Sequence, residues 1–270
     1  MQRTAPAIVL TAVVFFLAGF AQAQSLGTSA RQLSKGSLKL SAYYQGTQDE
    51  KLNFSVAGPG VCSAQGLPGV TFACGQGGDV DVKGSGGAGI VKAVCQPFEN
   101  IQYYGSVGAG NYSLQAPSAT LTNTLTGDRP GMILTAGAKA VVFPDTIVSP
   151  AVALDFSLSR SRYYFNRIFP GGSTGNNISQ RLDLMQYQIA VETSHVFLIE
   201  DSFKLEPYGG VKMQWTQADI KDLDSGSHAG GRRESQRPFI GVRVLAYENE
   251  VLFAEATVIN GYQYAAGLEV

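Results

Sequence analysis

The stretch FKLEPYGGVKMQWT, residues 203–216, decides the fold. Its residues alternate, because every second position is apolar or small and most positions between them are polar or charged. Successive side chains of a β-strand point to opposite faces of the sheet, so this alternation indicates a strand with one apolar and one polar face. The apolar face takes Phe203, Leu205, Pro207, Gly209, Val211, Met213 and Trp215, and the polar face takes Lys204, Glu206, Tyr208, Lys212, Gln214 and Thr216.

The same alternation recurs along most of the chain in unusually long segments. Ordinary globular strands have about five or six residues, whereas a strand that crosses a membrane within a barrel needs about 9–11. We therefore expect an all-β fold, a closed antiparallel transmembrane β-barrel of about ten strands, with eight as the alternative count. The ten predicted strands cover residues 36–46, 87–95, 99–114, 131–142, 151–165, 181–198, 203–218, 237–247, 251–259 and 262–270.

The predicted connections differ systematically in length. The odd-numbered ones are long and polar, over residues 47–86, 115–130, 166–180 and 219–236, while the even-numbered ones are short. The last odd connection departs from this rule, because it is a tight turn at Asn260-Gly261. Long loops on one rim and short turns on the other are typical of an outer-membrane barrel with both chain ends in the periplasm. A soluble lipocalin-like barrel or sandwich is the alternative, and it would not need this asymmetry.

The N-terminus has the features of a secretory signal. Arg3 precedes an apolar run from Ile8 to Phe20, and small residues follow in Ala21-Gln22-Ala23. The run is shorter than the roughly 20 apolar residues that span a bilayer. We expect cleavage between Ala23 and Gln24. The chain then divides into a signal peptide at 1–23, a periplasmic N-terminal segment at 24–35 and the barrel at 36–270.

The charge and cysteine content of the chain exclude some classes of protein and bear on whether it forms a disulfide. The 270 residues contain 20 Lys and Arg against 21 Asp and Glu, so a dedicated nucleic-acid binder, which needs a basic surface, is not expected. Only 15% of residues are charged and 44% are hydrophobic, which is unlike a disordered chain. Cys62 and Cys74 are close enough in sequence to form a disulfide in an exported protein, with three unpaired thiols as the alternative.

The closing stretch YQYAAGLEV, residues 262–270, together with the signal and the alternating strands, resembles the small bacterial outer-membrane β-barrel proteins over about residues 36–270. In that family the last strand usually ends in an aromatic residue, which serves as a signal for the barrel-assembly machinery. Here it ends in Val270, so either the terminus is atypical or residues are missing. The resemblance implies an outer-membrane monomer that contacts membrane lipid and lipopolysaccharide and is folded by that machinery.

The polar faces of the strands would line the barrel interior. Their charges are nearly balanced, and a barrel of about eight strands leaves room only for side chains or one small ligand. Unpaired buried charges are costly, so we expect ion pairs and a plugged or very narrow lumen. The predicted lumen charges are Lys39, Lys92, Lys139, Lys204, Lys212 and Arg243 against Asp155, Glu192, Glu206, Glu255 and Glu269.

The expected function is a structural or surface-interaction protein that presents long extracellular loops on a rigid barrel. A narrow porin for small solutes is the alternative, and a rim hydrolase that uses His228 is a further one. We expect no catalytic residue, cofactor or metal: Asp222–Gly226 resembles the start of a calcium loop, but Arg233 stands at its twelfth position. Arg160 and Arg162 have outward parity near the outer rim, where they could contact lipopolysaccharide phosphates.

Overall fold

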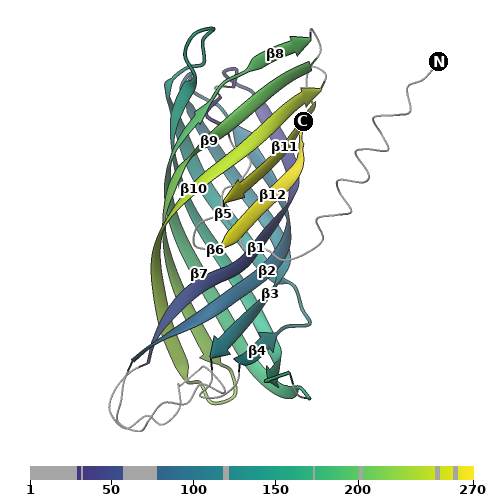
Figure 1. Ribbon diagram of the computed structural model, residues 1–270, viewed down its shortest axis with the longest axis vertical. Helices are drawn as coiled ribbons and strands as arrows, with labels where there is room; N and C mark the ends of the chain where they lie inside the picture. The colour runs from purple at the N-terminus through teal and green to yellow at the C-terminus, as the bar shows by residue number, and fades with distance from the viewer. Residues whose placement is uncertain are drawn as a thin grey trace, which may run out of the picture.

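The computed structural model describes residues 29–31, 33–56, 78–117, 122–172, 174–200, 203–246, 250–257 and 261–270. Twelve strands form one sheet that closes into a barrel (Figure 1), and every ladder between them is antiparallel. The predicted all-β, closed antiparallel barrel is therefore confirmed. The strands are β1 Leu38–Val56, β2 Gly78–Cys95, β3 Ile101–Pro117, β4 Thr122–Thr126, β5 Gly131–Phe143, β6 Ala151–Pro170, β7 Asn176–Ser194, β8 Phe197–Glu200, β9 Phe203–Asp222, β10 His228–Ala246, β11 Glu250–Thr257 and β12 Tyr262–Glu269.

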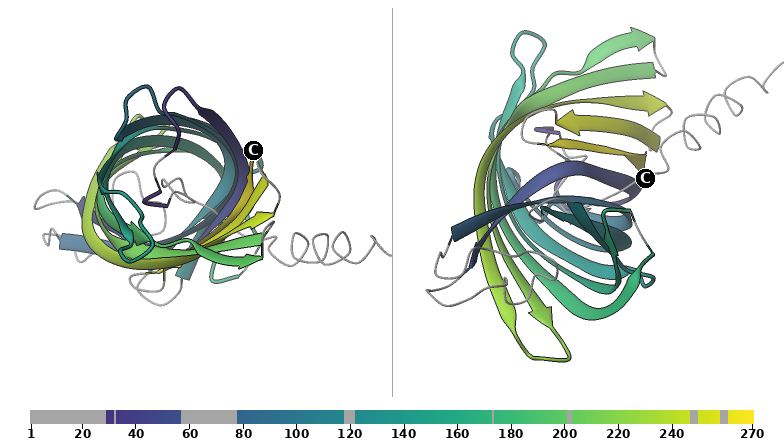
Figure 2. Two further views of the ribbon diagram at one scale, coloured as in Figure 1. Left: turned by 90° about the horizontal axis from the view of Figure 1, so that it is seen from above. Right: turned by 60° about the horizontal axis from the view of Figure 1, so that its bottom comes forward.

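The wall of the barrel is ten strands wide. β4 and β5 occupy one position, because both pair with β3 on one side and with β6 on the other. β8 is a four-residue strand that pairs only with the start of β9. The ring closes through the short hairpin of β11 and β12, which lies between β10 and β1, and β10 and β1 pair directly beyond that hairpin. Figure 2 shows the closed ring from above.

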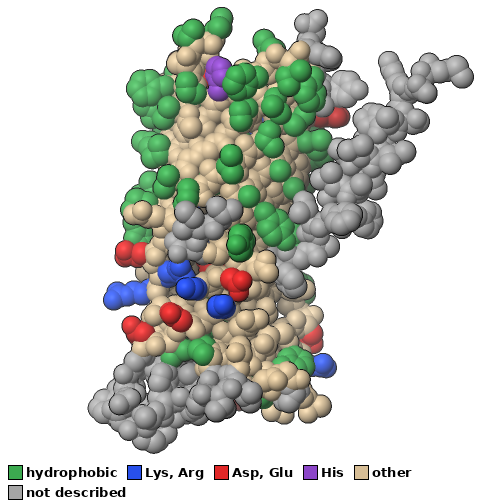
Figure 3. Space-filling model, in the orientation of Figure 1, with side chains coloured by type: hydrophobic (Ala, Val, Ile, Leu, Met, Phe, Trp, Pro, Cys, Tyr) green, Lys and Arg blue, Asp and Glu red, His purple; other side chains and the backbone are tan. Residues whose placement is uncertain are grey.

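Two halves of the barrel differ in chemistry. One half contains Val270 and the connections 96–100 and 144–150, and we call this half the base; it lies at the top of Figure 1. In the other half β1 ends and β2 begins, and we call this half the crown. On the base, apolar side chains cover the outside, whereas on the crown the outside carries charges of both signs (Figure 3). β7 shows the change along one strand: Ile189 and Val191 are exposed near the base, and Arg181 and Asp183 take the same outward parity near the crown.

The interior changes in the opposite sense. On β7 the inward side chains are Leu182 and Leu184 in the crown, then Gln186, Gln188 and Glu192 toward the base. The crown interior is a packed apolar core, in which the rings of Tyr112 and Tyr163 stack with centroids 4.9 Å apart. The crown core includes Leu52, Phe54, Val80, Val82, Leu114, Leu125, Ile133, Phe165, Leu182, Leu184, Ala218 and Ile220, each at most 6% exposed.

This inversion of polarity explains where the predicted strand boundaries were wrong. Seven strands have 17 to 20 residues and run into the stretches predicted as long loops. The four connections are residues 57–77, 118–121, 171–175 and 223–227, instead of 47–86, 115–130, 166–180 and 219–236. In the crown the apolar residues occupy the inward positions of each strand. A strand predicted from its outward apolar residues therefore ends where the base meets the crown.

β1 changes its register within the wall. Its ladder with β2 is interrupted between Thr47 and Glu50, and Asp49 has φ +56°, a left-handed conformation that is uncommon outside glycine. The bulge moves the inward parity from Gln45 and Thr47 to Glu50 and Leu52, so the strand can continue into the crown core. No helix in the described part of the chain is long and apolar enough to cross a membrane.

Candidate functional site: the filled interior of the base

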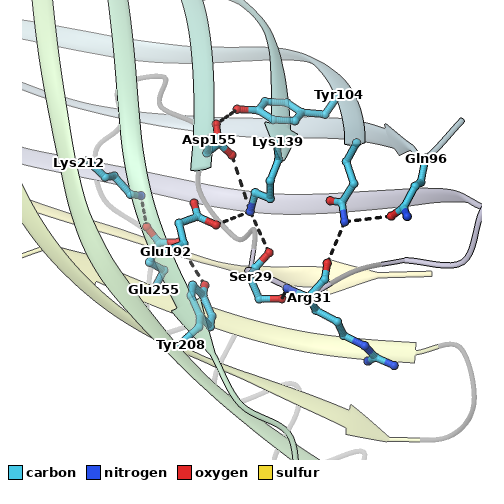
Figure 4. A network of polar contacts seen from close by, with 11 residues as sticks. Ser29, Arg31, Gln96, Tyr104, Lys139, Asp155, Glu192, Tyr208, Lys212 and Glu255 are labelled. Atoms are coloured by element: carbon cyan, nitrogen blue, oxygen red, sulfur yellow. Dashed lines mark hydrogen bonds and ion pairs between the residues drawn. The ribbon is translucent and has the colours of Figure 1, made fainter. Parts of the chain in front are cut away.

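The centre of the base interior is the ammonium group of Lys139 on β5. This side chain is fully buried and forms ion pairs with Glu192 on β7 and with Asp155 on β6, the latter at 3.7 Å. Tyr104 on β3 donates its hydroxyl hydrogen to Asp155 at 2.6 Å (Figure 4). Alternation places these four side chains inside, and the pairing of β3, β5, β6 and β7 brings them to one level.

A second group of buried charges lies on the neighbouring strands β9 to β12. Lys212 on β9 pairs with Glu255 on β11, which also accepts a hydrogen bond from the hydroxyl of Tyr208 at 3.2 Å. Arg243 on β10 pairs with Glu206 at 3.4 Å and with Glu269 at 2.7 Å. Charge-assisted contacts of this kind keep the cost of burying each ion low, so these pairs fix the positions of four neighbouring strands.

The structure places ten of the eleven predicted lumen charges in contact with one another or with an aromatic ring. Lys39 pairs with Glu269 at 3.4 Å. The Lys92 ammonium lies 4.3 Å from the centroid of the Tyr104 ring, a favourable cation–π arrangement. The exception is Lys204, which is half-buried near the start of β9 and forms no ion pair with a described carboxylate.

One fully buried ion pair among the described residues, between Glu50 and Arg237, was not expected from the sequence. Glu50 was assigned to a loop and Arg237 to the first position of a strand, yet both side chains are fully buried, with Nη2 and Oε1 2.8 Å apart. Arg237 shares its inward parity with Arg243, six residues later on β10. The alternation along β10 could therefore have predicted that Arg237 points inward. The bulge in β1 interrupts the alternation before Glu50, so the sequence pattern does not show that Glu50 points inward.

The interior of the base also contains Ser29 and Ala30, the first described residues of the chain. Residues 24–35 were predicted to lie in the periplasm, but Ser29 and Ala30 are buried inside the ring, as the short purple piece in the left view of Figure 2 shows. Lys139 donates to the carbonyl oxygen of Ser29 at 2.9 Å, and Gln102 donates to that of Arg31 at 2.8 Å. These two contacts hold main-chain atoms of the segment. A small hollow beside it is lined by Ser29, Arg31, Leu33, Val94, Gln102, Arg243 and Glu269.

A band of uncharged polar residues separates the charges of the base from the apolar core of the crown. Four of its glutamines are at most 4% exposed, and their amide groups have no hydrogen-bond partner among the described residues. Buried amides prefer partners, so this band is the least rigidly specified layer of the interior. The glutamines concerned are Gln45, Gln186, Gln188 and Gln263.

Ala23, Gln24, Cys62 and Cys74 are outside the described residues, so the cleavage site and the disulfide stay predictions, and Cys95 is an exposed free thiol. His228 is exposed at the first position of β10. The described residues contain no cluster of three His, Cys, Asp or Glu side chains suited to a metal.

The loop that resembles a calcium site is a tight turn. The Asp222 carboxylate accepts hydrogen bonds from the backbone N–H groups of Asp224 at 2.9 Å and Ser225 at 3.0 Å. Gly226 adopts a positive φ of 73° and donates its N–H to the carbonyl oxygen of Asp222. The carboxylate that would begin a calcium loop is therefore engaged in holding the turn.

Comparison with known proteins gives likeness of shape only. No protein-family model matches the chain, and no curated protein matches it in sequence. Among solved structures it is similar to the translocator domain of the autotransporter NalP from Neisseria meningitidis, with 13% identity over 98% of this chain and 93% of that one, and a TM-score of 0.45. It is also similar to the outer-membrane protease OmpT from Escherichia coli, with 12% identity over 89% and 99% of the two chains and a TM-score of 0.48. Identities this low carry no information on activity.

Proposed function

We propose that the protein is an outer-membrane β-barrel with a closed lumen, which holds its crown outside the membrane as a structural or surface-interaction module. The base would lie in the bilayer, with Val270 toward the periplasm. In this proposal the chain is not an enzyme, it needs no cofactor, and the interior charges hold the wall together. Most of the described residues that were expected to form long extracellular loops belong instead to the walls of the crown.

The outside of the base supports a place in the bilayer. Large apolar side chains on most of the ring are exposed there at positions that alternate with buried polar ones. A soluble protein seldom exposes an apolar surface that surrounds it, because burial of apolar area is favourable. Lipid would cover this surface, which includes Leu38, Leu40, Val91, Ile101, Tyr103, Leu134, Leu154, Phe156, Ile189, Val191, Val211, Met213, Ile240 and Leu268.

The apolar core of the crown is the observation that carries the closed lumen. Phe54, Leu114 and Leu125 extend into the barrel from β1, β3 and β4, and each is fully buried. Packed apolar side chains leave few voids as large as a water molecule, so ions and hydrated solutes have no path through this layer. The ion pairs and the N-terminal segment obstruct the base in addition, which makes a porin the less well supported function.

Single-channel recording in planar bilayers tests the proposal. We expect the refolded protein to insert without a stable conductance step. As the matched comparison we choose the double variant Phe54→Ser/Phe165→Ser, which makes the crown core smaller and polar and is expected to pass brief currents. Its folded state is checked by the faster gel migration of an unboiled barrel. Large, stable and salt-dependent conductance of the unaltered protein would establish a porin instead.

A further inference from the structure

The outward face of β6 and β7 changes from apolar to basic at one level of the barrel. Along β6, the exposed Phe156 and Leu158 are followed at the same parity by Arg160 and Arg162. Arg160 pairs in register with the exposed Leu134 of β5, so the basic residues begin where the apolar surface ends. In a membrane, the edge of the apolar surface lies beside the lipid headgroups.

A single carboxylate orders two of the guanidinium groups. Arg162 on β6 donates its Nε hydrogen to Asp183 on β7 at 2.6 Å, and the Nε of Arg181 lies 2.7 Å from the other oxygen of Asp183. Both contacts use Nε, so Asp183 itself does not occupy the Nη hydrogens of either guanidinium. The side chains are 36% and 28% exposed, which leaves them accessible.

The charge of this surface remains positive after its internal ion pairs are counted. Lys221 on β9 pairs in register with Arg181, and Asp219 pairs in register with Asp183. Arg160 is exposed and has no ion pair with a described carboxylate. This surface therefore carries four cations and two carboxylates, and its net positive charge favours an anionic partner. The cations are Arg160, Arg162, Arg181 and Lys221, and the carboxylates are Asp183 and Asp219.

We propose that Arg160, Arg162 and Arg181 form a binding site for the phosphate groups of an outer-leaflet glycolipid. Arginine suits this role because its planar guanidinium forms paired hydrogen bonds to phosphate oxygens. Asp183 fixes two of the three guanidinium groups before the lipid binds, which lowers the entropy lost on binding. The inference deepens the proposed function and rests on it, because it requires the base to lie in the membrane.

The test compares two lipids that differ only in phosphate. The purified protein in uncharged detergent is titrated with diphosphorylated lipid A and with its dephosphorylated form. We expect Arg160→Gln/Arg162→Gln to weaken binding of the phosphorylated lipid at least about tenfold, as the loss of two charge-assisted contacts implies. Arg160→Gln alone removes no ion pair between described residues, so it keeps the test valid if the double variant folds poorly.

Arg167→Gln is the matched control, because Arg167 is an exposed arginine of the same strand farther from the apolar edge. It should bind as the unaltered protein does. Equal affinity of the double variant and the unaltered protein would overturn the site, as would equal affinity for the two lipids. Displacement of the lipid by millimolar inorganic phosphate would also overturn it, in favour of a free-phosphate site.

The two proposals fail in different ways. A protein that never migrates as a heat-modifiable barrel, or that stays out of lipid vesicles, contradicts the proposed function itself. A protein that enters vesicles as a folded barrel but does not discriminate between the lipids contradicts the phosphate site alone.

Discussion

Arg237 on β10 and Glu50 on β1, 187 residues apart in the chain, form an ion pair that is fully buried, with 2.8 Å between Nη2 and Oε1. The pair joins the two strands that flank the short β11–β12 hairpin. Just beyond that hairpin β1 and β10 are joined by only two registered residue pairs, Phe54 with Gly231 and Ser55 with Gly230. Arg233 reinforces this seam, because its guanidinium donates to the carbonyl oxygen of Lys51. Side chains therefore complete the closure of the barrel where backbone pairing is sparse.

Removing one partner of the seam pair should destabilise the barrel strongly. Glu50→Gln leaves Arg237 buried without a counter-charge, which typically costs about 3–5 kcal/mol. Glu50→Leu/Arg237→Met removes both charges and should recover most of that loss. Urea titration of the vesicle-inserted barrel measures both variants. A loss below about 1 kcal/mol for Glu50→Gln would show that the pair does not hold the seam.

Lys139→Met should both destabilise the barrel and release the N-terminal segment. The substitution leaves Asp155 and Glu192 buried with their shared cation removed, and it deletes the donor to the Ser29 carbonyl. We expect faster proteolysis around residues 29–31 and a lower urea midpoint. Lys204→Met is the control, since Lys204 is half-buried without an ion pair to a described carboxylate. Unchanged protection of the segment would contradict its anchoring by Lys139.

The crown core should behave like the core of a soluble protein. Leu114 is fully buried, so Leu114→Ala should lower the free energy of unfolding by about 2–5 kcal/mol through lost burial and a cavity. Leu223 is 44% exposed in a crown turn, and Leu223→Ala should change stability by less than about 0.5 kcal/mol. Equal effects of the two substitutions in urea titrations would argue against a packed crown.

The turn at residues 222–226 should loosen in acid. Backbone N–H groups of Ser225 and Asp224 donate to the Asp222 carboxylate, and they lower its pKa from the ordinary value. A depressed folded pKa means that the stabilisation is present above the unfolded pKa and is lost as the pH falls through the folded one. NMR should show the Ser225 amide signal titrating below the usual range for aspartate, and Asp222→Asn should abolish that titration. A Ser225 midpoint at or above the usual value contradicts the contact.

The alternation of residues such as Val191, Ile189 and Tyr187 was enough to predict the barrel, its antiparallel sheet and its ten-strand wall. Period-two patterning is local, so a single strand reveals it. The inward charges were found in the same way, since parity alone places Asp155 and Lys139 inside. Their partners depend on register between strands, which local pattern does not specify.

The remaining features depend on context that local pattern lacks. The crown was assigned to loops because Phe54, Val80 and Ile220 are apolar at the inward parity, the reverse of the base. The bulge at Asp49 shifts the parity of Glu50, which hid its pairing with Arg237. Ser29 is held inside the ring by the hydrogen bond that its carbonyl oxygen accepts from Lys139, 110 residues away. Every residue has a backbone carbonyl group, so the identity of residue 29 does not predict this contact.

The most direct test of the central claim is a site-directed spin-label scan of β7 in lipid vesicles, with Cys62, Cys74 and Cys95 replaced by serine. Labels at 187, 189 and 191 should be relaxed by oxygen, which concentrates in lipid. Labels at 181 and 183 should be relaxed by a water-soluble nickel complex, and labels at 182, 184 and 190 should be inaccessible to both. Nickel accessibility at 187, 189 and 191 would contradict a membrane-embedded base, and nickel accessibility at 182, 184 and 190 would contradict a closed lumen.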